Sequence, residues 1–77
     1  MLRYMLFSHK KSYSKIGGYV ANANTRDSFL SHIAFKFQRV KVSQDGAKKY
    51  EPMFSIRELR KALSRGYISV ELVGVAI

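Results

Sequence analysis

The chain contains no cysteine, and this absence excludes several kinds of site. Without thiols there is no disulfide, no thiolate ligand for a metal and no cysteine nucleophile. A chain without disulfides suits a reducing compartment, so the sequence predicts a cytoplasmic protein. A domain of 77 residues without such cross-links depends for its stability on packing, on a partner or on self-association.

Long apolar runs are also missing. No stretch of 18 apolar residues occurs, so we expect no membrane-spanning helix and no membrane partner. The first residues, MLRYMLFSHKK, place their basic pair after the apolar residues, which is the reverse of the order in a secretory signal peptide. Because domains usually have about 100–150 residues, residues 1–77 are expected to form a single domain.

Motifs for metal binding and for catalysis are absent from the sequence. His9 and His32 are far apart, and no carboxylates are grouped with them at the spacing of metal ligands. No serine lies in a G-x-S-x-G turn, and Gly17-Gly18 lacks the spaced glycines and the lysine of a phosphate-binding loop. We therefore expect no enzymatic activity, no metal and no cofactor.

One catalytic alternative stays open, a small nuclease that works without a metal. His9 stands beside Lys10, Lys11 and Tyr13, and such groups supply acid–base chemistry and cationic stabilisation of a phosphate. A solvated histidine in a loop explains the same residues more simply.

Acidic residues are scarce. The chain has five Asp and Glu against fourteen Lys and Arg, which gives a formal net charge of +9. Such an imbalance attracts polyanions over long distances, and nucleic acid is the commonest polyanionic partner. An acidic protein surface, or a role of the charge in solubility alone, are the alternatives. The 47% hydrophobic residues favour a packed core over disorder.

The clearest local signals lie in residues 54–73. Ser55 and Glu58 form an S-x-x-E capping box, and Phe54 and Leu59 have the spacing of a hydrophobic staple, so a helix is expected to begin here. Gly66 provides a stop signal, and the apolar residues then alternate as in a strand.

This helix is predicted to have two opposite faces. The apolar face consists of Ile56, Leu59, Ala62 and Leu63. The basic face consists of Arg57, Arg60, Lys61 and Arg65, a set that fits a phosphate backbone but also an ordinary solvent-facing helix surface.

The first half of the chain is less clearly patterned. Residues 2–7 alternate as in a strand, residues 8–15 suggest a loop or hairpin tip, and residues 19–21 suggest a short second strand. Residues 22–38 fit a helix and a strand equally well. The capping residues Asn24 and Thr25 and the length of the segment favour a helix over about residues 25–37, with Phe35 off its apolar arc.

Residues 39–53 predict a β-hairpin, because Asp45-Gly46 is typical of a two-residue turn with positive φ at both positions. With that loop, Lys41 is opposite Tyr50. One face then carries Arg39, Lys41, Lys48 and Tyr50, and the other carries Val40, Val42, Lys49 and Glu51. Pro52 has no N–H to donate and marks a strand end or edge.

These elements predict a ferredoxin-like β-α-β-β-α-β fold, an α+β domain with two helices on one face of a four-stranded, mainly antiparallel sheet. The order is similar in outline to that of RNA-recognition domains, but the resemblance stops at topology. Their aromatic strand motif is missing, and its nearest counterpart is residues 34–37.

The predicted function is non-catalytic binding of DNA or RNA, through the basic helix face, the hairpin face around Tyr50, and Lys10 and Lys11. The alternative is a small inhibitor or adaptor that docks on an acidic or nucleic-acid-binding surface of a larger protein complex. Val73, Val75 and Ile77 fit either a docking stripe or an edge strand that pairs two copies into a homodimer.

Overall fold

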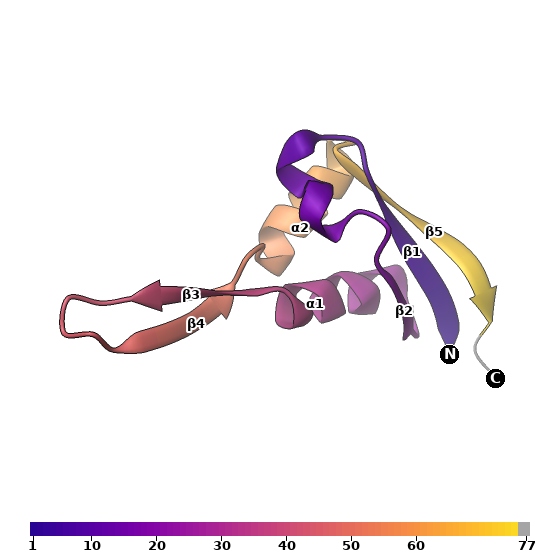
Figure 1. Cartoon of the computed structure of the whole chain (residues 1–77). Coiled ribbons are helices and arrows are strands. Elements are labelled where there is room, and N and C mark those ends of the chain that lie inside the picture. Colours follow the sequence, from indigo (N-terminus) through magenta and orange to yellow (C-terminus); the bar gives the residue numbers. More distant parts are fainter. Residues whose placement is uncertain (76–77) are drawn as a thin grey trace.

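The computed structural model describes residues 1–75, over which the chain folds as an α+β domain with two separate antiparallel sheets (Figure 1). Ile77, predicted to belong to a docking stripe or an edge strand, lies outside the described residues. One sheet has three strands in the order β2-β1-β5, and the other is the two-stranded hairpin β3–β4. The elements are β1 (Leu2–Ser8), the 3-10 helix η1 (Lys11–Ile16), β2 (Val20–Ala23), α1 (Arg26–Lys36), β3 (Gln38–Val42), β4 (Lys48–Pro52), α2 (Ile56–Ser64) and β5 (Ile68–Val75).

The core lies between the three-stranded sheet and the helices that cover one of its faces (Figure 1). Successive residues of a strand point to opposite faces, so Tyr4 and Leu6 of β1 are buried while Arg3 is exposed. The antiparallel register places Val70 of β5 beside Leu6, and Val70 is buried as well. Alternation in the central strand and its neighbour therefore defines the inner face of the sheet.

The helices complete this core with apolar residues at helical spacing. α1 buries Phe29, Leu30 and Ile33, and α2 buries Leu59 and Ala62. Each large side chain that is removed from water contributes about 1.5–3 kcal/mol before the entropy of ordering is counted. The core is accordingly small, as expected for a chain of this length.

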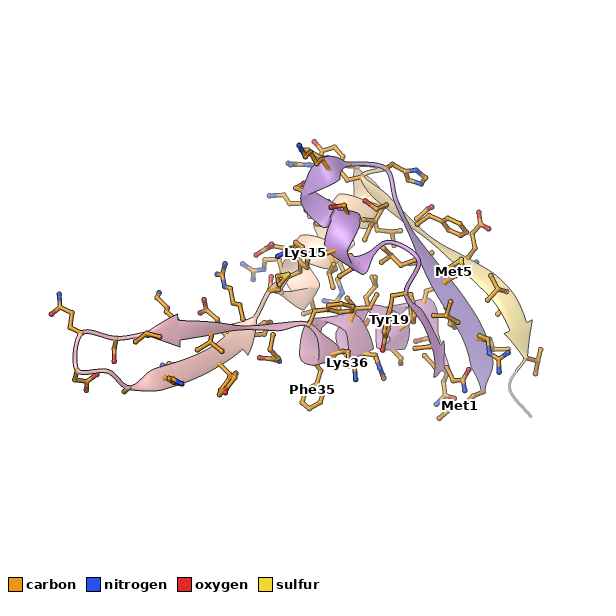
Figure 2. All side chains as sticks on the ribbon, in the orientation of Figure 1. Met1, Met5, Lys15, Tyr19, Phe35 and Lys36 are labelled. Atoms are coloured by element: carbon orange, nitrogen blue, oxygen red, sulfur yellow. The ribbon has the colours of Figure 1, made fainter. Side chains whose placement is uncertain are left out.

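The helix predicted over residues 25–37 is confirmed as α1. The Thr25 hydroxyl accepts a hydrogen bond from the Ser28 N–H (3.0 Å) and caps the helix. Phe35 is 80% exposed and points away from the body of the molecule (Figure 2). The aromatic residue that did not fit the apolar arc is therefore the one that the helix leaves in solvent.

The predicted start of α2 at the Ser55 cap and its stop at Gly66 are also confirmed. Ser55 Oγ accepts a hydrogen bond from the Glu58 N–H (3.1 Å), and Gly66 adopts a φ of 76° before β5 begins. Leu63, predicted to share the apolar face with Leu59, is only partly buried. The ring of Phe54 packs 5.2 Å from the ring of Tyr13, which belongs to η1.

Two weaker expectations for the N-terminal region have different outcomes. The segment of residues 8–15 contains the 3-10 helix η1 and is more ordered than the predicted loop. Its Ile16 is fully buried, which explains why the segment folds onto the body. The short strand predicted at residues 19–21 is confirmed as β2, which pairs antiparallel with β1 and places Val20 opposite Met5.

The predicted four-stranded ferredoxin-like sheet is wrong. β3 and β4 pair with each other and, over residues 1–75, with no strand of the larger sheet. All of β3 and all of β4 except the half-buried Glu51 are exposed. These strands carry Arg39, Lys41, Lys48 and Lys49, whose burial against the core would be costly. The outline similarity to RNA-recognition domains ends with this topology.

The predicted hairpin register is wrong by one residue. Lys41 is opposite Lys49, and Tyr50 is opposite Val40. The loop closes through a bond from the Ser43 N–H to the Ala47 carbonyl (2.9 Å), and only Gly46 has positive φ. It is therefore a three-residue loop with a glycine bulge, where two positive-φ residues were expected. A slip of one residue moves a whole strand's side chains to the other face.

Candidate nucleic-acid interface

The hairpin of residues 38–52, which we call the hairpin arm, projects away from the body of the molecule (Figure 1). Its base is fixed by a bond from the Met53 N–H to the Phe37 carbonyl (2.9 Å) and by one from Gln38 Nε2 to the Phe35 carbonyl (2.8 Å). The hydrophobic core includes no residue of the arm. The arm is thus a two-stranded ribbon that is accessible on both faces.

One face of the arm is mainly apolar. Val40 and Val42 of β3 are opposite Tyr50 and Lys48 of β4. Val40 is 50% exposed and Tyr50 68% exposed, so the aromatic ring keeps a surface free although the two side chains are neighbours. Pairs of an aromatic and a β-branched residue stabilise antiparallel strands by roughly 0.2–1 kcal/mol. The pair supports the ribbon and at the same time presents an aromatic surface.

The opposite face is basic. Near the base, Arg39 Nε donates to Glu51 Oε1 (2.7 Å), and the two charges offset each other. One step further out, Lys41 is directly opposite Lys49, and neither forms an ion pair within the described residues. Like charges in directly opposed positions destabilise a pair of strands. This part of the ribbon therefore carries positive charge at a cost to its own stability.

The acidic residue at the tip, Asp45, forms no ion pair with these lysines within the described residues, because its carboxylate is engaged in the loop. The Asp45 carboxylate accepts hydrogen bonds from the Ser43 hydroxyl and from the Ala47 N–H (3.1 Å). These bonds, first that of Ser43, lower the pKa of Asp45 below its ordinary value. The carboxylate thus remains ionised at neutral pH and is engaged in the turn.

On α2, the predicted basic face is exposed but differs from the expectation in one residue. Arg60 donates to both oxygens of Asp27 on α1, with both distances 2.8 Å, and so joins the two helices. This ion pair raises the pKa of Arg60 and neutralises its charge. Arg57, Lys61 and Arg65 remain as the exposed cations of this helix.

The structure adds further cations to this region that the helical wheel could not reveal. The Tyr13 ring of η1 packs between those of Phe54 and Tyr67, which precede and follow α2. Lys10 Nζ lies 4.0 Å from the centre of the Tyr67 ring. η1 therefore packs against the residues that flank α2, and we use the name helical patch for the exposed cations of these two segments: Lys10, Lys11, Lys15, Arg57, Lys61 and Arg65. Figure 2 labels Lys15 on η1.

His9, the candidate catalytic residue of the nuclease alternative, is engaged in a structural contact. His9 Nε2 lies 2.8 Å from Ser69 Oγ, across the β1–β5 pair, while Tyr13 is engaged with aromatic rings. A shallow hollow beside His9 is lined by Phe7, Ser8, His9, Lys10, Lys11, Ser14, Gly17 and Gly18. Over residues 1–75, no three side chains of His, Asp and Glu are grouped as metal ligands.

The predicted site residues thus fall into two separate surfaces. Arg39, Lys41, Lys48 and Tyr50 are all in the hairpin arm, but Tyr50 and Lys41 lie on opposite faces. Lys10, Lys11, Arg57, Lys61 and Arg65 are in the helical patch, and Arg60 is paired. Lys49 was assigned to the wrong face because of the register.

No helix among the described residues is long and apolar enough to cross a membrane. No protein-family model, curated protein or solved structure matches the chain.

Proposed function

We propose that the protein binds nucleic acid and that the hairpin arm is its principal contact. The observation that carries this proposal is the pair of opposed lysines, Lys41 and Lys49, on a ribbon with no core of its own. An isolated two-stranded hairpin is only marginally stable in water. Placing like charges across it lowers that stability further, and a bound polyanion would remove the repulsion.

The shape of the arm supports the same proposal. The major groove of duplex DNA admits a two-stranded β-ribbon, and phosphates on either side of a groove can contact cations on both faces. Lys48 lies on the face of Tyr50, whereas Lys41 and Lys49 lie on the other. Tyr50 also offers a ring on which an unpaired base can stack. Among the side chains that the structure describes, no set is arranged to read base edges, so we expect weak sequence preference.

The helical patch is the second contact in this proposal. Its cations come from two elements, η1 and α2, that are separate in the sequence and adjacent in the fold. Phosphate contacts of this kind add affinity without sequence selectivity.

The test is a salt titration with a fluorescently labelled oligonucleotide, single-stranded and as a duplex. Each phosphate that a side chain neutralises contributes roughly 0.7–0.9 to the slope of log K against log salt. Lys41→Gln/Lys49→Gln should reduce that slope by about 1.4–1.8 and weaken binding to all sequences. Because the repulsion is gone, the same variant should melt at an equal or higher temperature than the parent.

The matched control removes two cations elsewhere. Arg3 lies on β1, and Arg26 begins α1 at the end near the sheet. Arg3→Gln/Arg26→Gln has the same net charge as the lysine variant and should leave most of the slope intact. If the two double variants lose binding equally, only net charge matters and the arm is not the contact. If the parent binds no oligonucleotide at low salt, the proposal fails.

A second candidate function is docking on an acidic surface of another protein, as an inhibitor or adaptor. The exposed side chains of Val40, Val42 and Tyr50 favour it, because an apolar stripe bordered by lysines suits a protein surface. Val40→Thr/Val42→Thr distinguishes the two functions. Nucleic-acid binding should tolerate this change, whereas docking through the stripe should not.

A further inference from the structure

The large hydrophobic side chains that remain exposed in the described chain gather in distinct places. Val40, Val42 and Tyr50 are in the hairpin arm and Phe35 is near its base. The remaining ones are in or beside the three-stranded sheet: Met1, Leu72, Val73 and Val75 are near the end where β1 begins, and Val20 is on the other edge strand, β2, opposite Met5. Three of these five belong to β5, which is 8 residues long and forms one edge of the sheet.

Within residues 1–75, the backbone of this edge strand is also unpaired on one side. In an antiparallel pair, residues that exchange hydrogen bonds alternate with residues whose N–H and C=O point away. The bond from the His9 N–H to the Tyr67 carbonyl (2.8 Å) sets the phase of the β1–β5 ladder. Val70 and Leu72 consequently direct their backbone groups away from β1, toward the free edge.

Accessibility increases along the strand toward its end. Val70 is 8% exposed, Leu72 50% and Val75 67%. Val73 is an extra residue between the pairs Tyr4–Leu72 and Arg3–Gly74, and this bulge leaves its side chain 47% exposed. The second half of β5 thus combines free backbone groups with exposed apolar side chains.

We propose that this half of β5 pairs with the same segment of a second copy of the chain, in antiparallel orientation about a twofold axis. The charge of the strand favours a second copy of the chain as its partner. β5 contains no Lys or Arg, and Glu71 is its only charged residue. β5 therefore has no cation that could bind a polyanion or an acidic protein. Two copies of a chain with net charge +9 can approach here without a cation in either paired strand, and the nearest one, Arg3, lies on the neighbouring strand β1 opposite Gly74.

Glu71 also restricts the register. Pairing Val70 with Leu72 of the second copy would place Glu71 directly opposite its own counterpart, and like charges in that position are destabilising. Pairing Leu72 with Leu72 of the second copy places Glu71 opposite Val73 instead. The bulge keeps the paired stretch short, so Leu72, Val73 and Val75 contribute most of the apolar contact. The joined sheet has six strands, within the usual range.

The first test compares charge placed on the edge with charge placed on the arm. Leu72→Lys/Val75→Lys introduces two lysines on β5, a common protection of natural edge strands. Val40→Lys/Val42→Lys adds the same charge to positions of similar exposure, 50% and 62%, in the arm. Sedimentation velocity over a concentration series should show the parent and the arm variant moving from 8.8 kDa monomer to dimer, and the edge variant remaining monomeric.

The second test reads the register and uses the absence of cysteine from the chain. Opposed residues in a hydrogen-bonded pair have Cα atoms about 5.5 Å apart, which a disulfide can span. Leu72→Cys should therefore form a covalent dimer on mild oxidation, whereas Val40→Cys, equally exposed at 50%, should not. A parent that stays monomeric at every concentration, a dimeric edge variant, or equal cross-linking of the two cysteine variants would overturn the proposal.

Discussion

At the scale of single residues, the ion pair between Asp27 and Arg60 links α1 to α2 and gives folding a defined pH dependence. The hydrogen bonds from Arg60 lower the pKa of Asp27 below its ordinary value of 3.8. A group whose pKa is lower in the folded state stabilises the fold above its unfolded-state pKa. That contribution is lost as the pH falls through the folded-state pKa.

We therefore expect Asp27→Asn to melt below the parent at neutral pH, and the two melting curves to converge in the acidic range below 3.8. Glu71→Gln, whose carboxylate makes no ion pair within residues 1–75, serves as the control and should follow the parent at protein concentrations low enough to keep both monomeric. Adding Arg60→Gln to Asp27→Asn should cause little further change. A further large loss would show that Arg60 stabilises the fold without its partner.

Tyr50 presents a second prediction at this scale. If its ring stacks on a base, Tyr50→Ala should weaken binding to single strands by roughly 1–3 kcal/mol with little change in the salt slope. Tyr50→Phe should bind nearly as the parent does, because stacking requires the ring and not the hydroxyl. Fluorescence anisotropy measures both.

The control for Tyr50 is Tyr50→Val. Valine is β-branched and favours strands, so it preserves the ribbon opposite Val40, but it has no aromatic ring. If Tyr50→Val binds like Tyr50→Phe, the ring supports the hairpin and does not contact a base.

At the scale of elements, α2 shows how far local signals reach. Its cap, its stop and its inward-facing Leu59 follow from neighbouring residues, and all were predictable from sequence. The degree of burial was not, because Leu63 lies near the boundary of the helix layer and is only partly covered. The degree of burial of Leu63 depends on packing against residues that are distant in the sequence, so it cannot be predicted from the helix sequence alone.

The expected consequence is a graded response within one helix. Leu59→Ala should cost about 2–5 kcal/mol of unfolding free energy, as for a fully buried leucine, and Leu63→Ala clearly less. Ser55→Ala should cost about 1 kcal/mol through loss of the cap, while Ser64→Ala, at the other end of the helix, should have little effect. Chemical denaturation measures all of these, and equal losses at Leu59 and Leu63 would contradict the described packing.

The hairpin arm shows the opposite case. Its existence was predictable from Asp45-Gly46, but its register was not, because the same dipeptide fits loops of two and three residues. The choice depends on the hydrogen bonds from Ser43 and Ala47 to Asp45, which hold Asp45 out of the positive-φ region. Since the register assigns side chains to faces, the composition of the candidate site changed with it.

An arm of this kind should open more easily than the sheet. Amide protons of Lys41 and Lys49, which lie in its ladder, should exchange faster with solvent than that of Leu6 in the central strand. Added oligonucleotide should slow exchange in the arm and leave Leu6 unchanged. Nuclear magnetic resonance exchange measurements resolve these sites, and protection that is uniform over the molecule would argue against binding at the arm.

At the scale of the whole molecule, the body and the arm are separable. The core includes no residue between Phe37 and Met53, and these two residues are hydrogen-bonded to each other. Replacing residues 38–52 with a short glycine-containing turn should therefore give a protein that still unfolds cooperatively. It should bind oligonucleotide only through the helical patch, with a smaller salt slope than the parent. Loss of cooperative unfolding would show that the arm contributes to the fold of the body.

The projecting arm has a further consequence for how fast a target is found. The molecule measures 46 × 28 × 18 Å, and Lys41, Lys48 and Lys49 lie in the outer part of its long projection, so part of its positive charge lies far from its centre of mass. A polyanion that approaches from the side of the arm meets these lysines before it meets the cations of the helical patch. Long-range attraction of this kind raises the association rate and is strongly screened by salt. The salt sensitivity of binding should accordingly appear largely in the association rate.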